Sequence, residues 1–338
     1  MHGQTNEFRF EYASLALVVS SVVALYGMVL SERFAPRTVP EATIAARAPI
    51  VAIPAPEVLG PVDESARWLT ESAESVGTLV ELFGRADYRL DGVRVGDSRV
   101  PRILIDRMPA DLHRVVSADT RKSVFIRLML PMVLYANEQI RSARARVTVL
   151  RARFEMRGGR LAADERAWLL VLGERYGVEG VDFKELLRRV DEIPPSLAIA
   201  QAAEESGWGT SRFVREGNAV FGQRTFTEGK GLVPLRRDQG ETHEVKTFNK
   251  PLDSVIGYMI NLNSHFAYDE FRLVRERQRR TMGRLDGYAL SGTLDRYSER
   301  GEAYIATIRS IIAGNELHQF DGVSLGNGEA LLRLGSDV

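Results

Sequence analysis

The chain has 338 residues, equal numbers of basic and acidic side chains (45 each), and no cysteine. A net charge of zero gives no general attraction to nucleic acid, and we expect no nucleic-acid partner. The absence of cysteine excludes disulfides, thiolate nucleophiles and cysteine-based zinc sites. The length predicts one domain of moderate size with attached segments.

A long apolar run lies close to the start of the chain. Residues 12–30 contain three serines and one glycine but no charged side chain. At about 1.5 Å per residue, a helix of this length spans a hydrocarbon core roughly 30 Å thick. We therefore expect a short segment at 1–11 and a single transmembrane helix at 12–30. A buried core helix and a cleaved signal peptide are the alternatives, but the nearest Ala-x-Ala, at 46–48, lies far downstream.

A proline-rich segment follows the apolar run. Residues 31–62 carry six prolines among small side chains, which predicts an extended tether that cannot pack a core. Residues 63–160 then form a mixed and later helical upstream region. From Asp63 onward, apolar residues from Trp68 to Phe83 predict a helix that ends before Gly84, whereas residues 88–105 favour short strands.

Residues 120–154 place apolar side chains at helical spacing, and we expect Pro131 to bend or break this helix. The arginines on its other faces are expected to be solvated, with contact to anionic polymers or lipid headgroups as the alternative. Further helices are predicted at 163–176, ending at Gly177, and at 183–190, capped by Asp182.

The most informative stretch is 193–223, IPPSLAIAQAAEESGWGTSRFVREGNAVFGQ. Pro194 and Pro195 favour the first turn of a helix that begins near Ser196, and Gly207 favours its end. Glu205 lies in the last turn, where the helix dipole and the neighbouring indole disfavour a charged carboxylate. A general acid needs such a protonated form. A solvated pair of Glu204 and Glu205 at the helix end is the alternative.

This stretch resembles the catalytic helix of the bacterial glucosaminidases of glycoside hydrolase family 73. The family pattern is AQAA, a variable residue, ESGWGTS, and then GNN(L/I)FG. The resemblance implies that Glu205 is the catalytic acid and that Glu204 occupies the variable position. Ala219 departs from the pattern, because the family usually has a second Asn there. The segment KSVFIRLMLPMVLYANEQIRSAR also resembles the region upstream of the glucosaminidase core in bacterial Bax-type proteins, so the resemblance covers roughly 100–319.

The resemblance implies a mainly α fold, with a lysozyme-like helical core at 161–320, a small β-hairpin lobe and a C-terminal tail at 321–338. Residues 232–236 and 242–248 are suited to the two strands of the hairpin. In the family this lobe often supplies a second carboxylate, for which Glu241 and Glu244 are the candidates. Glu244 is preferred because it lies inside the predicted strand, and a surface charge pair is the alternative.

The resemblance also implies that Tyr297 lies near the reacting sugar and that Tyr304 is a second tyrosine of the site. Apolar spacing around Tyr304 supports a core position as its alternative. Tyr258, on a helix predicted at 252–263, offers a flat ring of the kind that binds sugars. The expected substrate-binding set is Gln201, Trp208, Asn218, Phe221, Tyr258 and Tyr304. No histidine spacing suggests a metal site, and we expect no metal or other cofactor.

The resemblance implies cleavage of the β-1,4 bond after N-acetylglucosamine in peptidoglycan, and together with the apolar run it predicts a membrane-anchored hydrolase. Its partners would be glycan strands and the bacterial inner membrane, with the catalytic domain facing the periplasm or cell wall. Arginines after the apolar run favour the opposite orientation, so the outward assignment depends on the substrate. A lytic transglycosylase, a non-catalytic glycan-binding protein and an N-glycan substrate are alternatives. Inverting, covalent and substrate-assisted routes all stay open.

Overall fold

The computed structural model describes residues 69–71, 75–234 and 243–326. The predicted transmembrane helix, the tether, Glu241 and the chain after 326 lie outside these residues. Within the described ranges, no helix is both long and apolar enough to cross a membrane.

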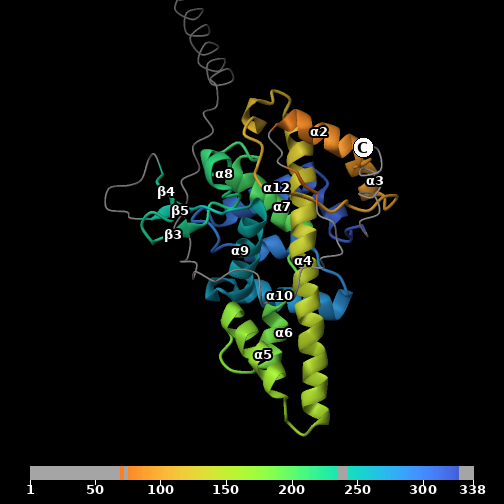
Figure 1. Cartoon of the computed structure of the whole chain (residues 1–338), viewed down its shortest axis with the longest axis vertical. Helices are drawn as coiled ribbons and strands as arrows, with labels where there is room; N and C mark the ends of the chain where they lie inside the picture. Colours follow the sequence, from red (N-terminus) through yellow and green to blue (C-terminus); the bar gives the residue numbers. More distant parts are fainter. Residues whose placement is uncertain (1–68, 72–74, 235–242, 327–338) are drawn as a thin grey trace, which may run out of the picture. The chain divides into compact units, whose positions relative to one another are not determined.

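The described part of the chain is mainly helical, as predicted (Figure 1). Its α-helices are α2 (Val76–Arg85), α3 (Leu90–Arg94), α4 (Ala118–Met156), α5 (Ala163–Tyr176), α6 (Phe183–Arg189), α7 (Pro195–Ser206), α8 (Arg212–Gly217), α9 (Pro251–Ser264), α10 (Asp269–Met282), α11 (Gly287–Leu290) and α12 (Glu302–Gly314). Short 3-10 helices are η2 (Leu112–Arg114), η3 (Phe266–Tyr268), η4 (Ser291–Thr293) and η5 (Leu317–Phe320).

Two small sheets accompany the helices. Strands β1 (Leu69–Glu71) and β2 (Ile103–Ile105) pair in parallel. Strands β3 (Arg224–Thr225), β4 (Gly231–Leu232) and β5 (Glu244–Lys246) form an antiparallel sheet in the order β3-β5-β4. The pairing of β4 with β5 confirms that these two segments form antiparallel strands, although β4 overlaps the predicted strand 232–236 only at Leu232. Strand β3 was not predicted, and it covers the other edge of β5.

Helix α4 is the longest helix described and packs against α7. The hydroxyl of Ser117 caps its first turn by accepting from the amide of Thr120. The helix continues through Pro131, so the expected break does not occur. Nearly every side chain at 124–137 is buried, because α7 and α9 both pack against this half of α4. The loss of one backbone hydrogen bond at proline is offset by burial on all sides.

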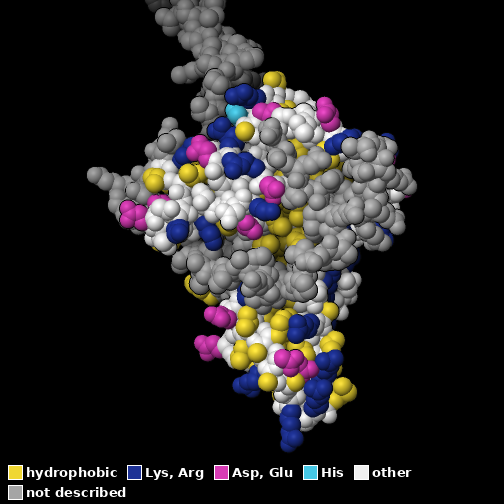
Figure 2. Space-filling model, viewed as in Figure 1, with side chains coloured by type: hydrophobic (Ala, Val, Ile, Leu, Met, Phe, Trp, Pro, Cys, Tyr) yellow, Lys and Arg dark blue, Asp and Glu magenta, His cyan; other side chains and the backbone are white. Residues whose placement is uncertain are grey.

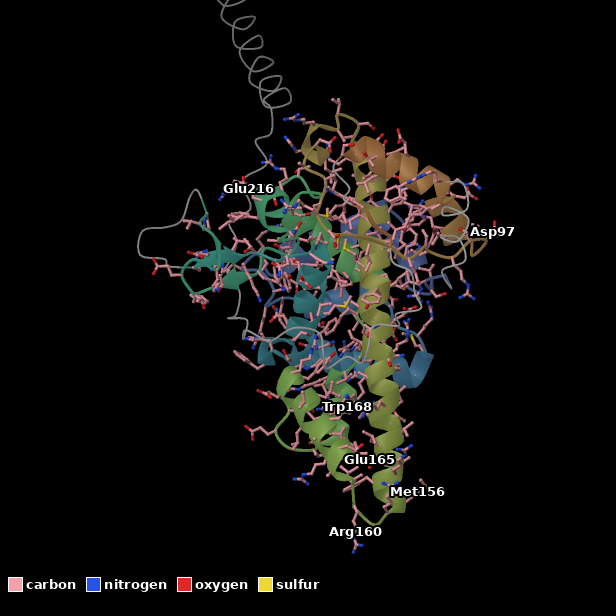
Figure 3. All side chains as sticks on the ribbon, in the orientation of Figure 1. Asp97, Met156, Arg160, Glu165, Trp168 and Glu216 are labelled. Atoms are coloured by element: carbon pink, nitrogen blue, oxygen red, sulfur yellow. The ribbon has the colours of Figure 1, made fainter. Side chains whose placement is uncertain are left out.

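The second half of α4 is buried on one face only and runs beside α5 and α6. Phe154 contacts Phe183 of α6, and the guanidinium of Arg153 binds Glu165 of α5 at 2.9 Å. Figure 3 shows Met156 and Arg160 at the free end of this helix pair, with Glu165 and Trp168 on α5. Basic side chains gather around this end in Figure 2. It is a solvated face whose charges are partly paired within the chain.

Helix α10 carries buried arginines toward the segment that precedes α7. The side chain of Arg275 is completely buried. Its guanidinium donates to the carbonyl oxygens of Asp191 and Glu192, to Asn263 Oδ1, and to two carbonyls at the end of α6. Burial lowers the pKa of Arg275 to about 10, so it remains charged at neutral pH. The buried carboxylate of Asp191 accepts in turn from Arg279 at 2.6 and 2.9 Å.

The start of α7 is held by one carboxylate. Asp321 accepts hydrogen bonds from the amide and the hydroxyl of Ser196, both at 2.8 Å, and from the amide of Gly287 at 3.1 Å. This arrangement joins α7, α11 and the segment after η5. Burial raises the pKa of the Asp321 carboxyl to about 6.

Candidate active site

The chain leaves α7 through three consecutive residues in the left-handed conformation. Gly207, Trp208 and Gly209 have φ values of +58°, +59° and +78°. This conformation is unfavourable for a residue as large as tryptophan, so the surrounding structure must hold it. Ser206 does so locally, because its hydroxyl accepts from the amide of Gly209 at 2.8 Å and donates to the carbonyl of Ala202.

Helix α4 and η2 support this turn from outside the motif. A Cβ atom on Gly209 would lie 2.7 Å from Leu112 Cδ2 and 3.0 Å from Phe125 Cδ2, so only glycine fits. The half-buried Trp208 ring meets Phe125 edge-to-face with centroids 5.8 Å apart. The ammonium of Lys122 lies 5.4 Å from the centre of the Trp208 ring. The upstream region therefore fixes the indole that follows Glu205.

Glu205 is half-buried and lies at the end of a chain of side-chain hydrogen bonds. Tyr258 donates its hydroxyl to Gln201 Oε1 at 2.6 Å, and Gln201 Nε2 donates to the hydroxyl oxygen of Tyr304 at 2.9 Å. Tyr304 in turn donates to Glu205 Oε1 at 3.1 Å. Gln201, Tyr258 and Tyr304 are all buried. Because each donor points toward the carboxylate, this Tyr258–Gln201–Tyr304 chain fixes the position of Glu205 and directs a hydroxyl dipole at it.

The neighbouring Glu204 has a different partner. Its carboxylate accepts from Arg300 Nη1 at 2.6 Å, and Arg300 Nη2 binds the hydroxyl of Thr307 at 2.7 Å. Of the two adjacent carboxylates, Glu204 therefore binds a charged guanidinium, whereas Glu205 accepts from a neutral phenol. This differs from the solvated pair considered as the alternative. The sequence did not single out Arg300, although it lies only three residues after Tyr297.

Tyr297 lies behind Tyr304 in the segment before α12. The two rings stack with centroids 5.4 Å apart and an angle of 15° between their planes. Tyr268 approaches Tyr297 from the other direction at 6.0 Å, and only 4 % of Tyr297 is exposed. The structure therefore brings both predicted tyrosines to Glu205, with Tyr304 making the contact. Contact between Tyr297 and a sugar stays a prediction.

Phe221 and Asn218 lie beneath the site. Phe221 is completely buried and stacks on Tyr258 with ring centroids 3.9 Å apart. Asn218 adopts φ +51° at the end of α8, and its side chain accepts from the amide of Met108 and donates to the carbonyls of Phe248 and Asn249. Their contacts give both residues a structural role, and substrate binding by them stays a prediction.

The carboxylate of Glu244 is buried inside the β-lobe. It accepts from the amides of Gly229 at 3.0 Å and Gly231 at 2.7 Å, and so closes the turn before β4. These two bonds use both carboxylate oxygens. A role for Glu244 as the second catalytic carboxylate stays a prediction. In the part of the chain that the structure describes, no three or more metal-ligating side chains come together.

These features belong to a glucosaminidase-domain protein. Residues 181–317 match the Glucosaminidase family, described as mannosyl-glycoprotein endo-beta-N-acetylglucosaminidase. Over 200 residues the chain is 31% identical to Protein bax of Escherichia coli (strain K12). The aligned region covers 57% of this chain and 69% of that protein. The chain therefore belongs to the Bax-like family of bacterial glucosaminidase-domain proteins, which confirms the resemblance found in the sequence. No solved structure matches the chain significantly.

Proposed function

We propose that this chain hydrolyses the β-1,4 bond after N-acetylglucosamine in peptidoglycan, with Glu205 as the general acid. The hydrogen-bond chain that ends on Glu205 Oε1 is the observation that carries this proposal. Since Tyr304 donates to Oε1, the other oxygen is favoured to carry the proton that goes to the leaving group. After that transfer, the same phenol stabilises the carboxylate.

The contacts of Glu244 favour a route that does not use it as a base. The Glu244 carboxylate is buried and held by the amides of Gly229 and Gly231, so a catalytic water has little access to it. We therefore propose that the acetamido group of the substrate attacks the anomeric carbon while Glu205 protonates the leaving oxygen. Water then attacks the same carbon and opens the cyclic intermediate, and the Glu205 carboxylate takes up the proton of that water. Two displacements at one carbon retain the anomeric configuration. Proton NMR of the first product then detects the β anomer, whereas an α product would overturn the route.

Products formed by the full chain in detergent test the activity itself. Wild-type protein, Glu205→Gln and the matched control Glu204→Gln are incubated with purified peptidoglycan, and the fragments are analysed by mass spectrometry. We expect reducing N-acetylglucosamine ends, a loss of at least about 100-fold in Glu205→Gln, and near wild-type activity in Glu204→Gln. Anhydro-muramic ends would indicate a transglycosylase. Glycan binding without any product would indicate a non-catalytic protein.

We also propose that residues 12–30 anchor the chain in the bacterial inner membrane, with the catalytic domain on the outer side. The uncharged apolar run supports the anchor, and the location of the proposed substrate supports the orientation. Protease treatment of spheroplasts is expected to digest the catalytic domain. Protection of the domain until the membrane is opened would contradict this orientation.

A further inference from the structure

A hollow of about 620 Å³ lies between α3, the first turns of α4 and the end of α12. Four cationic side chains line it, those of Arg89, Arg94, Lys122 and Arg127. Its volume falls in the range of pockets that bind small ligands, roughly 300–1,000 Å³. Glu205 is not among the lining residues, so the hollow is separate from the proposed acid.

The hollow also contains acidic side chains. Asp91, Asp119 and Glu316 lie in its lining, which leaves the four cations in excess by one. The position of Arg94 is fixed, because it binds Asp91 at 3.2 Å and the carbonyl of Asn315 at 3.1 Å. A neutral sugar does not require a lining with both signs of charge. A ligand with both carboxylate and ammonium groups matches them, and forked guanidinium groups bind carboxylates especially well.

Lys122 connects this hollow with the catalytic segment. It is in the lining, and its ammonium also lies over the ring of Trp208, three residues after Glu205. The walls of the hollow come from two parts of the chain. Helices α3 and α4 precede the residues that match the Glucosaminidase family, whereas the end of α12 lies inside them. A polymer that passes Trp208 can therefore place a side branch between the upstream region and the catalytic domain.

We propose that this hollow binds the peptide branch of the glycan, a short peptide with both carboxylate and ammonium groups. The inference rests on the proposed function, because it takes peptidoglycan as the substrate. It gives the upstream region a role in selecting strands that carry peptides. Arg89 is the most suitable residue for a test, because its side chain is 78% exposed and its substitution leaves the core intact.

The test is calorimetric titration of the full chain in detergent. Every protein titrated carries Glu205→Gln, so that the probes are bound but not cleaved. The probes are a disaccharide that carries a tetrapeptide and the same disaccharide without the peptide. We expect the peptide to improve affinity at least tenfold. Arg89→Glu should weaken binding of the peptide-carrying probe about tenfold, equivalent to about 1.4 kcal/mol, and leave binding of the other probe unchanged. Arg114→Glu is the matched control, since Arg114 is exposed and does not line the hollow. Circular dichroism verifies that both variants fold.

Equal affinity for the two probes would overturn the inference, and so would a peptide preference that Arg89→Glu leaves unchanged. The two proposals can fail separately. If the wild type cleaves peptide-free glycan and shows no peptide preference, the peptide site is contradicted and the proposed function is supported. Peptide-dependent binding without any cleavage removes the proposed catalytic activity and retains the hollow as a peptide site.

Discussion

The two ends of α7 are held by different kinds of interaction. At its start, one carboxylate and a set of backbone carbonyls accept from Ser196, Gly287 and the buried guanidinium of Arg275. At its end, a left-handed turn and the Tyr258–Gln201–Tyr304 chain position one side chain, Glu205. The first end therefore depends on buried charge. The second end depends on backbone geometry and on hydrogen bonds to the proposed acid, so substitutions at the two ends should act for different physical reasons.

The largest effect on stability is expected from Arg275→Met. The substitution leaves several buried carbonyl oxygens without their donor and weakens the compensation of Asp191. Removing one partner of a buried ionic network costs about 3–5 kcal/mol. Urea denaturation of the full chain measures this loss. Arg277→Met is the control on the same helix, because Arg277 is exposed, and it should change the unfolding free energy by less than about 0.5 kcal/mol.

The buried arginines also explain which helices the sequence could predict. Helices α5, α6, α7 and α9 have local signals at their ends, such as the Asp182 cap and the left-handed Gly177, and their predicted positions are confirmed. Helix α10 was not predicted, because Arg272 and Arg275 occupy core-facing positions where an apolar repeat would be sought. Strand β3 has only two residues, too few for a pattern.

The next effect concerns the turn at the other end of α7. Gly209→Ala should cost about 1–2 kcal/mol from its positive φ, and roughly 1–3 kcal/mol more from contact with Leu112 and Phe125. The control Gly158→Ala has a similar φ of +60° but open space around the new Cβ. It should show the backbone cost alone. Equal losses in thermal denaturation of the two variants would contradict the packing part of this prediction.

The third effect separates function from stability. Tyr304→Phe removes the donor to Glu205, so we expect about a tenfold lower kcat and a loss of about 1 kcal/mol in unfolding free energy. Tyr88→Phe is the control. The hydroxyl of Tyr88 is also buried but has no hydrogen-bond partner among the described residues, so its removal should be nearly neutral in both measurements. Equal kcat values for Tyr304→Phe and wild type would show that the phenol does not act on the carboxylate.

The same chain marks the limit of what the sequence revealed about the site. The resemblance identified Glu205 and the two tyrosines, because each lies in a recognisable segment of the sequence. It did not indicate that Gln201 points between Tyr258 and Tyr304, since that contact joins α7, α9 and α12. Gln201 is completely buried and makes a positioning contact in this structure, and substrate binding by it stays a prediction. Such a role depends on tertiary packing, which no local pattern contains.

The smallest effect at neutral pH is expected at the start of α7. Burial raises the pKa of Asp321 to about 6 from an ordinary value of 3.8, so the folded protein takes up a proton more readily than the unfolded chain. Stability from this group is fully present below about pH 4 and is lost as the pH rises through about 6. Asp321→Asn lacks this titration. In urea denaturation, the unfolding free energy of wild type relative to Asp321→Asn should therefore rise by about 1–2 kcal/mol from pH 7 to pH 4. A gap that changes in the opposite direction would mean that the three donors from Ser196 and Gly287 stabilise the charged carboxylate more than burial disfavours it.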